Sequence, residues 1–337
     1  MYKGLQVGRG IAALLVVLHH ATLSGDVFYG NDAFNGFWDF GHIGVDFFFV
    51  LSGFIIYWAH SGDSAGIDTA ALYIKKRLIR IYPPFIIPSV ILLFSYTMLP
   101  GLSESNRVIG IVTSLLLIPT PPLEPALSVS WTLMHEMLFY TFFLIIFINR
   151  KMLHVFFVTW GIVIIVLNVS MVHDGLLMNF LMHPHNLQFL FGVVAAVLVK
   201  NEKQNILFIV VGLAMLAAYL VGHQFHAYEN ASVLILKAYL GIGFMFIVVG
   251  LCSVESRVRY PDFLIFIGAA SYSVYLIHNP VISVANRIAQ KIYQQNLFNP
   301  EVFFVFTATL GLMSGIIYYL VWEKPSLRYL QRTYLKK

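Results

Sequence analysis

Arg9 and His20 stand at the two ends of an apolar stretch, GRGIAALLVVLHHA, that is typical of a membrane-spanning helix. They are eleven positions apart, about three helical turns, so both side chains share one helix face roughly 16 Å apart. An imidazole can take up a proton near neutral pH, whereas a guanidinium binds phosphate or carboxylate groups. Alternatively, Arg9 only anchors the helix at the membrane face, and His20 only forms a hydrogen bond to another helix. Ionisable groups inside a membrane are nevertheless functional candidates by default.

Two carboxylates are expected at the depth of His20. Asp46, in GHIGVDFFFVLSGF, lies near the outer end of the second predicted span, and Glu136, in SWTLMHEMLFY, lies in the outer half of the fourth. We predict that His20 is a general base for a hydroxyl group. Either carboxylate can fix the tautomer of the imidazole, and Asp46 is favoured because the first two spans are neighbours in the sequence.

The ninth predicted span adds a polar face. Ser271, Tyr275 and His278, in SYSVYLIHNP, follow an i, i+4, i+7 spacing and therefore lie on one side of a helix. His278 is expected at the same level as His20, Asp46 and Glu136. The pattern predicts one shared polar cavity, in which these three residues bind an acceptor hydroxyl or an oxyanion.

A second cluster of charge is expected at the opposite membrane face. Arg77 and Arg80, in YIKKRLIRIYPP, are i and i+3 and hence neighbours on a helix. The planar forks of two guanidinium groups suit phosphates, although anionic lipid headgroups would also fit. A donor with a phosphorylated head and a long thin arm could rest on Arg77, Arg80 and Arg9 while its reactive end reached His20.

The elements that must position these residues are membrane helices. Hydrophobic residues make up 59% of the chain and charged residues only 11%, which is typical of a polytopic membrane protein. We predict an all-α bundle of about ten spans in a single domain, 1–337. The spans are expected at 8–23, 41–60, 78–99, 131–149, 152–172, 185–199, 205–222, 232–252, 262–283 and 302–322. The short apolar segment 107–118 is expected to form a re-entrant or surface helix in the longest loop.

The lysines and arginines divide unequally between the two sets of loops, which predicts that both termini are cytoplasmic. One set carries only Arg107, Arg287 and Lys291, and Lys237 falls inside a span. The other set carries Lys3, Arg9, Lys75, Lys76, Arg77, Arg80, Arg150, Lys151, Lys200, Lys203, Arg257, Arg259, Lys324, Arg328, Arg332, Lys336 and Lys337. This distribution indicates contact with membrane lipids and not with nucleic acid.

Several other motifs do not predict a site. HEMLF begins like a zinc-binding H-E-x-x-H, but Phe139 takes the place of the second histidine, so no metal is predicted. The motifs HPH at 183–185 and HQFH at 223–226 are interpreted as interfacial histidines, and EKPSLRYLQRTYLKK as a basic amphipathic anchor. The single cysteine, Cys252, excludes an intramolecular disulfide. Without a nucleophile elbow or a reactive cysteine, direct attack by a hydroxyl is favoured over a covalent intermediate on the protein, although such an intermediate stays open.

Five motifs in order give the chain a resemblance to a known family. The R-x10-H pair of the first span, GVDFFFVLSGF, KRLIRIYP, SWTLMHEMLFY and SYSVYLIHNP resemble the acyltransferase-3 family of integral membrane acyltransferases. Within that family, the N-terminal GLQVGRGIAALLVVLHH is most similar to exopolysaccharide O-acetyltransferases. A second acidic residue often follows the glutamate of the fourth motif, but here that position is Met137.

The resemblance implies a function and a location. It implies acyl-CoA as the co-substrate, with acetyl-CoA favoured, no tightly bound cofactor, and an extracytoplasmic glycan such as exopolysaccharide or lipopolysaccharide as the acceptor. It implies that Arg9 and His20 act as a pair, that Arg77 and Arg80 bind the donor, and that the protein lies in a bacterial cytoplasmic (inner) membrane. The alternative from the residues alone is a proton-coupled transporter that uses the same polar cavity.

Overall fold

The computed structural model describes residues 2–29, 33–99, 107–170, 175–228, 230–292 and 299–335. Parts of the sequence predictions fall outside these ranges: the first part of the long loop (100–106), the end of the fifth span (171–172), Lys336, Lys337 and the side chain of Lys291.

The described chain is built from helices, which confirms the predicted all-α class. The first half contains α1 (Lys3–Tyr29), the 3-10 segment η1 (Ala33–His42), α2 (Ile43–His60), α3 (Ile67–Met98), α4 (Ile111–Leu116), η3 (Ser128–Ser130), α5 (Trp131–Phe143), η4 (Leu144–Phe147) and α6 (Arg150–Ser170). The second half contains α7 (Leu176–Leu181), α8 (His185–Lys200), α9 (Leu207–Gln224), α10 (Val233–Ser253), α11 (Asp262–Ile292), α12 (Pro300–Tyr318), the π-helical segment η5 (Tyr319–Glu323) and α13 (Lys324–Tyr334). In the described ranges, β-type pairing is limited to isolated bridges in the loop around α4.

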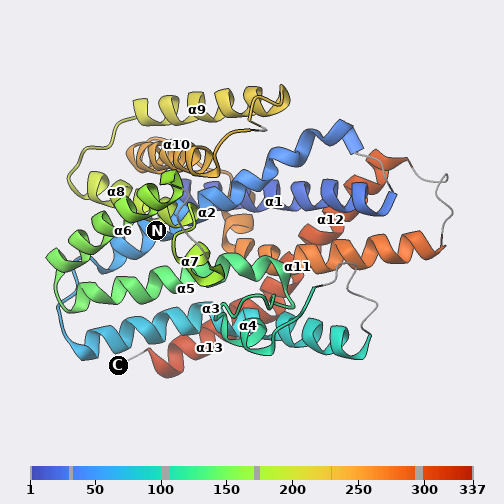
Figure 1. Ribbon diagram of the computed structural model, residues 1–337, viewed down its shortest axis with the longest axis horizontal. Helices are drawn as coiled ribbons and strands as arrows, with labels where there is room; N and C mark the ends of the chain where they lie inside the picture. The colour runs from blue at the N-terminus through green and yellow to red at the C-terminus, as the bar shows by residue number, and fades with distance from the viewer. Residues whose placement is uncertain are drawn as a thin grey trace.

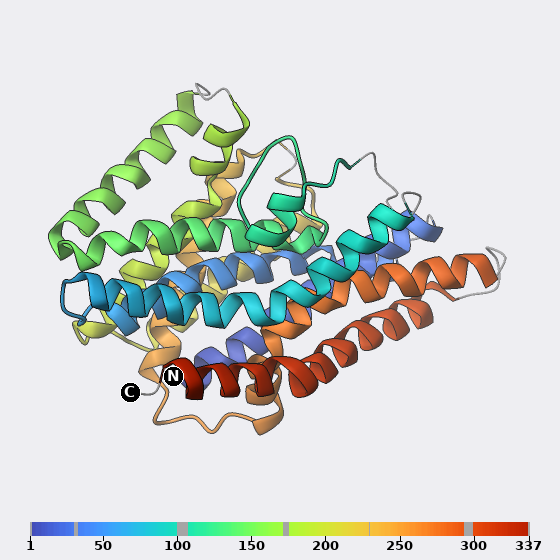
Figure 2. The ribbon, with the colours of Figure 1, turned by 90° about the horizontal axis from the view of Figure 1, so that it is seen from below.

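Ten helical segments in the described ranges are long and apolar enough to cross a membrane, which confirms the predicted number. They are Lys3–Asp26, Ala33–His60, Ile67–Met98, Ser128–Phe147, Arg150–Ser170, Leu176–Lys200, Leu207–Gln224, Val233–Ser253, Asp262–Gln290 and Pro300–Tyr334. Most of them run along the long axis of the molecule, and the two ends of the chain lie at the same end of it (Figure 1). Figure 2 shows α12 continuing into α13, which lies beside α3.

The third span is longer than the apolar pattern predicts. The apolar pattern predicts a start at residue 78, but α3 begins at Ile67. The first turns of the helix are polar, so a pattern of apolar residues does not include them. Three prolines lie inside this helix, and each leaves the carbonyl four residues earlier without its usual partner. The hydroxyl of Tyr318 donates to the carbonyl of Pro84, the one that Pro88 leaves open, at 2.8 Å. The C-terminal part of the chain therefore satisfies the backbone of α3 in a setting without water.

The centre of the bundle is formed by α1 and α2, which pack on α11 and α8 respectively. At the crossing of α2 and α8, a methyl group on Gly53 would collide with the carbonyl of Phe189, and one on Gly192 with the carbonyl of Val50. Small residues let membrane helices approach this closely, and dispersion contacts then hold them. The pair α2–α8 is consequently a rigid wall for the site described next.

Candidate active site

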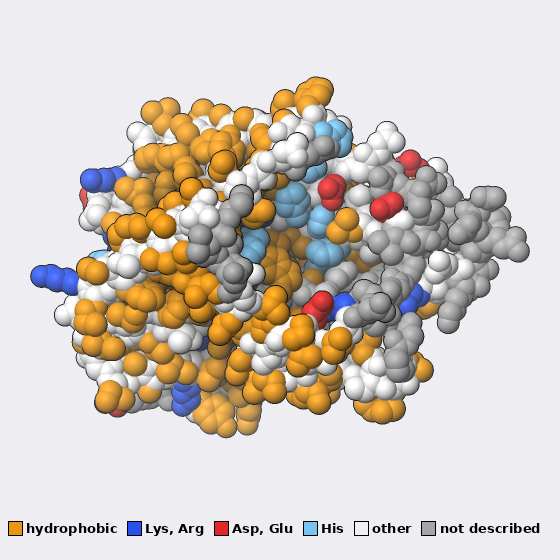
Figure 3. All heavy atoms as spheres, viewed as in Figure 1, with side chains coloured by type: hydrophobic (Ala, Val, Ile, Leu, Met, Phe, Trp, Pro, Cys, Tyr) orange, Lys and Arg blue, Asp and Glu red, His pale blue; other side chains and the backbone are white. Residues whose placement is uncertain are grey.

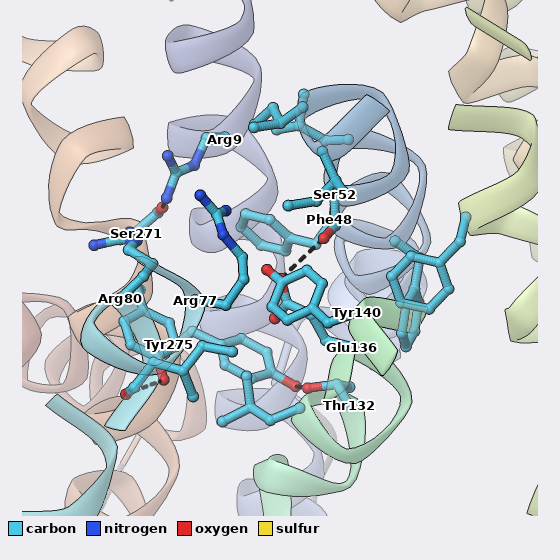
Figure 4. A pocket seen from close by; sticks show the side chains of 18 of the residues that line it. Arg9, Phe48, Ser52, Arg77, Arg80, Thr132, Glu136, Tyr140, Ser271 and Tyr275 are labelled. Carbon is cyan, nitrogen blue, oxygen red and sulfur yellow. Dashed lines mark hydrogen bonds between the residues drawn. The ribbon is translucent and has the colours of Figure 1, made fainter. Parts of the chain in front are cut away.

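A cavity of about 520 Å³ opens between helices on one side of α1 and α2. Its walls come from α1, α2, α3, α5, α8, α11 and the C-terminal α13, and Figure 4 shows the side chains that point into it. The polar and charged lining residues are Arg9, Ser52, Lys76, Arg77, Arg80, Thr132, Glu136, Tyr140, Ser271, Tyr272, Tyr275 and Gln331. The remaining lining residues are apolar, so the cavity combines polar groups with an apolar wall.

Three arginines gather in this cavity, as the sequence pattern predicted for a donor site. Arg9 donates from Nη2 to the hydroxyl of Ser271 at 2.9 Å and from Nη1 to the side-chain oxygen of Gln6 at 3.2 Å. The guanidinium of Arg77 lies 5.9 Å from the ring centre of Tyr73 and 5.8 Å from that of Tyr140. Within the described part of the chain neither arginine forms an ion pair, so both keep donors for an anionic ligand.

Arg80 is held differently. Its Nη1 donates to Oε1 of Glu323 at 2.6 Å, and the second carboxylate oxygen of Glu323 accepts from Ser273 at 2.5 Å. Glu323 is 0% exposed. A carboxylate at this depth needs a charged partner and further hydrogen bonds, so η5 and α11 together fix the direction of Arg80. The sequence analysis missed Glu323, because it interpreted the whole segment that begins at this residue as a surface anchor.

Glu136 lies in the same cavity as the arginines. It accepts from the hydroxyl of Ser52 at 2.9 Å and from the hydroxyl of Tyr140, one turn along α5. These two donors leave room for a further contact inside the cavity (Figure 4). Glu136 lines this cavity and His20 is not among its lining residues, so the structure does not place the two in the single shared cavity that the sequence predicts.

His20 is paired with His278. The Nδ1 of His278 lies 2.9 Å from the carbonyl oxygen of Val274, which can only accept, so this nitrogen carries the proton of a neutral ring. Its Nε2 is then an acceptor, 3.2 Å from Nδ1 of His20, and Nδ1 of His20 also faces the carbonyl of Val16 at 3.0 Å. Both contacts assign the proton of His20 to Nδ1. The lone pair of Nε2 is left free, which is the state a general base requires.

The predicted partner of His20, Asp46, is engaged elsewhere, and this corrects the sequence analysis. Asp46 is 0% exposed and accepts from Lys237 at 2.9 and 3.2 Å and from Gln188 at 2.6 Å. It therefore joins α2 to α10 and α8. Lys237 is a cation inside a span, and such a charge finds an opposite charge in the bundle. The sequence therefore indicated that Lys237 needs a carboxylate partner, and the structure identifies that partner as Asp46.

The face of α11 that was predicted as one acceptor site is divided. Ser271 belongs with Arg9, whereas His278 belongs with His20. Tyr275 lies between them: it lines the cavity, its hydroxyl contacts Thr132 at 2.9 Å and donates to the carbonyl of Val129 at 3.0 Å, and its ring centre lies 5.9 Å from that of His278. The shared helix face was predicted correctly, but its residues serve two neighbouring places because seven positions along a helix span about 10 Å.

Comparison with known proteins decides the family. A family model for an acyltransferase domain, acyltransferase-3, matches residues 2–318. The chain belongs to the acyltransferase-3 family. It is 28% identical over 308 residues, 86% of this chain and 90% of the relative, to the exopolysaccharide production protein ExoZ of Rhizobium meliloti (strain 1021).

A second relative matches less of the chain. This alignment, to protein 2 in the picA locus of Rhizobium radiobacter, is 29% identical over 149 residues and covers 38% of this chain and 73% of the relative. No solved structure is significantly similar to the chain. Family membership and ten apolar helices together make the protein an integral membrane acyltransferase-3 protein.

The matched region contains most of the candidate site described above but not all of it. It includes the arginines, Glu136 and the His20–His278 pair, and it ends at residue 318. Gln331, which lines the cavity, and Glu323, which binds Arg80, lie beyond it. In the described part of the chain, no three His, Cys, Asp or Glu side chains converge as a metal site would require.

Proposed function

We propose that this protein is an O-acyltransferase that moves an acyl group, with acetyl favoured, from acyl-CoA to a hydroxyl of an extracytoplasmic glycan. The observation that carries the proposal is the arrangement along α1 and α11. Tyr275 lines the cavity that contains the three arginines, and its ring centre lies 5.9 Å from that of His278, the partner of His20. The phosphorylated head of the donor and its acyl end would thus lie on opposite sides of the Tyr275 side chain. The similarity to an exopolysaccharide production protein supports a glycan acceptor.

The donor would lie with its phosphates at the arginines. Arg9 and Arg77 offer donors without competing carboxylates, and Lys76 adds charge at the wall of the cavity. The apolar wall from Ile55 to Phe48 would contact the thin arm of the donor, because both belong to one side of α2. Charge-assisted hydrogen bonds to phosphate then supply affinity, and the apolar wall supplies direction.

The chemistry needs one proton acceptor near the hydroxyl. Nε2 of His20 takes the proton of the hydroxyl while its oxygen bonds to the acyl carbon, and the carbon–sulfur bond breaks. The released thiolate of CoA takes up a proton, so the products are an ester and the free thiol. His278 and the carbonyl of Val16 hold Nδ1 of His20 and stabilise the ring while it is charged. Cys252, buried in α10, is outside the cavity lining, so direct transfer is preferred to an acyl-enzyme.

The proposed location is the cytoplasmic membrane of a bacterium, with both termini in the cytoplasm. The support is the unequal division of lysine and arginine between the two ends of the bundle. Most of the Lys and Arg side chains visible in Figure 3 lie toward the end of the molecule that holds the termini. Acyl-CoA is a cytoplasmic metabolite, so the arginine-lined cavity would then be on the side where the donor is made.

The test is thioester turnover by the purified protein in detergent. Acetyl-CoA is supplied with and without an oligosaccharide prepared from the surface polysaccharide of the native cells and de-O-acylated with mild alkali. We expect release of free CoA thiol to depend on the oligosaccharide, and mass spectrometry to find the added acyl group on it. Uptake of a solute into proteoliposomes without thiol release would instead support the transporter.

A further inference from the structure

A second polar cluster lies at the end of the bundle opposite the termini, outside the cavity. It consists of Asp39 and His42 from η1, His19 from α1, and Tyr219 and His223 from α9. Figure 3 shows histidine side chains and acidic side chains around a hollowed part of the molecular face, in the half away from the termini. The proposed mechanism uses none of these residues.

Asp39 is the centre of this cluster. Its Oδ1 lies 3.1 Å from Nδ1 of His19, and its Oδ2 lies 3.9 Å from Nε2 of His223. The second distance is too long for a hydrogen bond. The side chain of Asp39 is 43% exposed, so the carboxylate has free lone pairs that face solvent and are flanked by two imidazoles. A carboxylate has about four acceptor positions, and hydroxyl groups are suitable donors to them.

The backbone of η1 holds Asp39 in place. His42 Nδ1 donates to the carbonyl of Asp39 at 2.9 Å, and its Nε2 therefore accepts from the hydroxyl of Tyr219 at 3.1 Å. Phe34 has a φ of 55°, a left-handed conformation that is costly for a bulky residue and persists only where surrounding contacts enforce it. The ring of Phe34 packs on Phe304, with centroids 5.4 Å apart.

The cluster also has an aromatic side and direct contact with the proposed base. Phe37 is 51% exposed and packs edge-on against Trp38, with centroids 5.1 Å apart. An exposed aromatic side chain next to an exposed carboxylate offers one surface for the C–H groups of a sugar and another for its hydroxyls. The ring of His19 lies 5.2 Å from that of His20, which is itself partly exposed.

We propose that Asp39, with His19 and His223, is the acceptor subsite and binds two neighbouring hydroxyls of a sugar ring, which brings a hydroxyl of the same sugar to His20. This inference rests on the proposed function, since it assigns the acceptor of that reaction. A metal at the same place would need three converging ligands, and the described residues provide no such group. Hydrogen bonding to a diol therefore fits the cluster best.

The first test is binding, which does not depend on catalysis. Calorimetry in nanodiscs would use the de-O-acylated oligosaccharide and the same oligosaccharide after periodate oxidation, which cleaves neighbouring diols. We expect the intact sugar to bind and the oxidised sugar to bind at least about 10-fold more weakly. Asp39→Asn should weaken binding of the intact sugar by roughly 10- to 150-fold, because it removes the charged acceptor. His223→Gln should weaken it less.

The matched control is Asp26→Asn, which removes the same charge from an exposed position on α1. It should leave sugar affinity unchanged, and Asp39→Asn should leave CoA-ester affinity unchanged. In turnover, Asp39→Asn should raise the KM for the oligosaccharide with kcat within a few-fold. Equal sugar affinity in the two asparagine variants, or equal binding of oxidised and intact sugar, overturns the subsite. Sugar binding without any thiol release would keep the subsite and refute the proposed reaction.

Discussion

At the scale of single residues, the site depends on which neighbour each ionisable group has. His20 was recognisable from its place on the helix face that carries Arg9, but its partner was not, because a histidine 258 positions away supplies it. The sequence favours Asp46 over Glu136 as that partner only because the first two spans are neighbours, since depth in the membrane can be predicted and direction around a helix relative to a neighbour cannot. Lys237 takes Asp46, which leaves His278 for His20.

The base is tested by comparing the histidines of α1 and α11. His20→Ala should lower turnover by about 100-fold or more with donor affinity near normal, because only proton transfer is lost. His278→Ala should lower turnover too, and His278→Gln should recover part of the loss, since its amide oxygen can accept from Nδ1 of His20. His19→Ala should chiefly raise the KM for the acceptor. Steady-state kinetics and calorimetry measure these effects, and equal loss of turnover in the His19 and His20 variants would contradict the assignment.

The two arginines of α3 should respond differently to substitution, because Arg77 has no ion-pair partner among the described residues and Arg80 is paired with Glu323. Arg77→Ala should weaken binding of a non-hydrolysable CoA thioester by roughly 10- to 150-fold, because charge-assisted hydrogen bonds to phosphate are lost. Arg77→Lys should recover only part, since an ammonium lacks the planar fork. Unchanged affinity in both variants, measured calorimetrically, would make Arg77 a lipid anchor.

Arg80→Ala should combine two losses. Donor affinity should fall, and thermal stability should fall as well, because Glu323 would be left buried without its cation. Glu323→Gln is the matched variant: it keeps the shape of the side chain, and it should weaken the donor through a misdirected Arg80. A melting temperature of Arg80→Ala equal to that of Arg77→Ala would contradict this distinction.

At the scale of elements, the ten spans could be predicted, because apolar length alone specifies a membrane helix. The short helix α4 falls within the apolar segment 107–118, where a helix was expected. The start of α3 and the role of α13 could not be predicted. The first turns of α3 are polar, and α13 reads as an amphipathic anchor, yet Gln331 on α13 lines the cavity. An amphipathic pattern says that a helix has a covered face, but not whether lipid or protein covers it.

The ion pair between α2 and α10 should be a stability element. Lys237→Met strands the fully buried Asp46, and we expect a loss of about 3–5 kcal/mol in the free energy of unfolding. The double variant Asp46→Asn, Lys237→Met should recover most of this loss, because no unpaired charge remains. A reversible denaturation titration in detergent measures both. A single variant as stable as the double one would show that Asp46 has another partner.

At the scale of the whole molecule, the two ends of the bundle have different chemistry. The cavity takes its arginines from the first turns of α1 and the first half of α3 and is also lined by Gln331 of α13, whereas the histidine cluster around Asp39 lies in the half away from the termini (Figure 3). Such polarity was predictable, because the alternation of loops assigns every polar residue to one end once the spans are counted. Which end faces the cytoplasm depends on loop charge alone, so it requires a direct measurement.

Single cysteines give that measurement. Leu123 lies in the loop around α4 and Lys203 in the loop between α8 and α9, and both are exposed. The native thiol, Cys252, is buried, and Cys252→Ala removes any background. Leu123→Cys should react with a membrane-impermeant maleimide in intact cells, whereas Lys203→Cys should react only after the membrane is permeabilised.

The labelling pattern tests whether the orientation of the bundle agrees with the proposed transfer of an acyl group from the cytoplasm to an extracytoplasmic glycan. The loop between α8 and α9, which contains Lys203, lies at the end of the bundle that holds both termini (Figure 1), and Gln331 of the C-terminal helix α13 lines the arginine-containing cavity. If Lys203→Cys were labelled from outside and Leu123→Cys were not, the arginines would face a compartment without acyl-CoA. The donor site and the acceptor subsite would then both be on the wrong sides, and the proposed reaction would fail even if every residue-level prediction held.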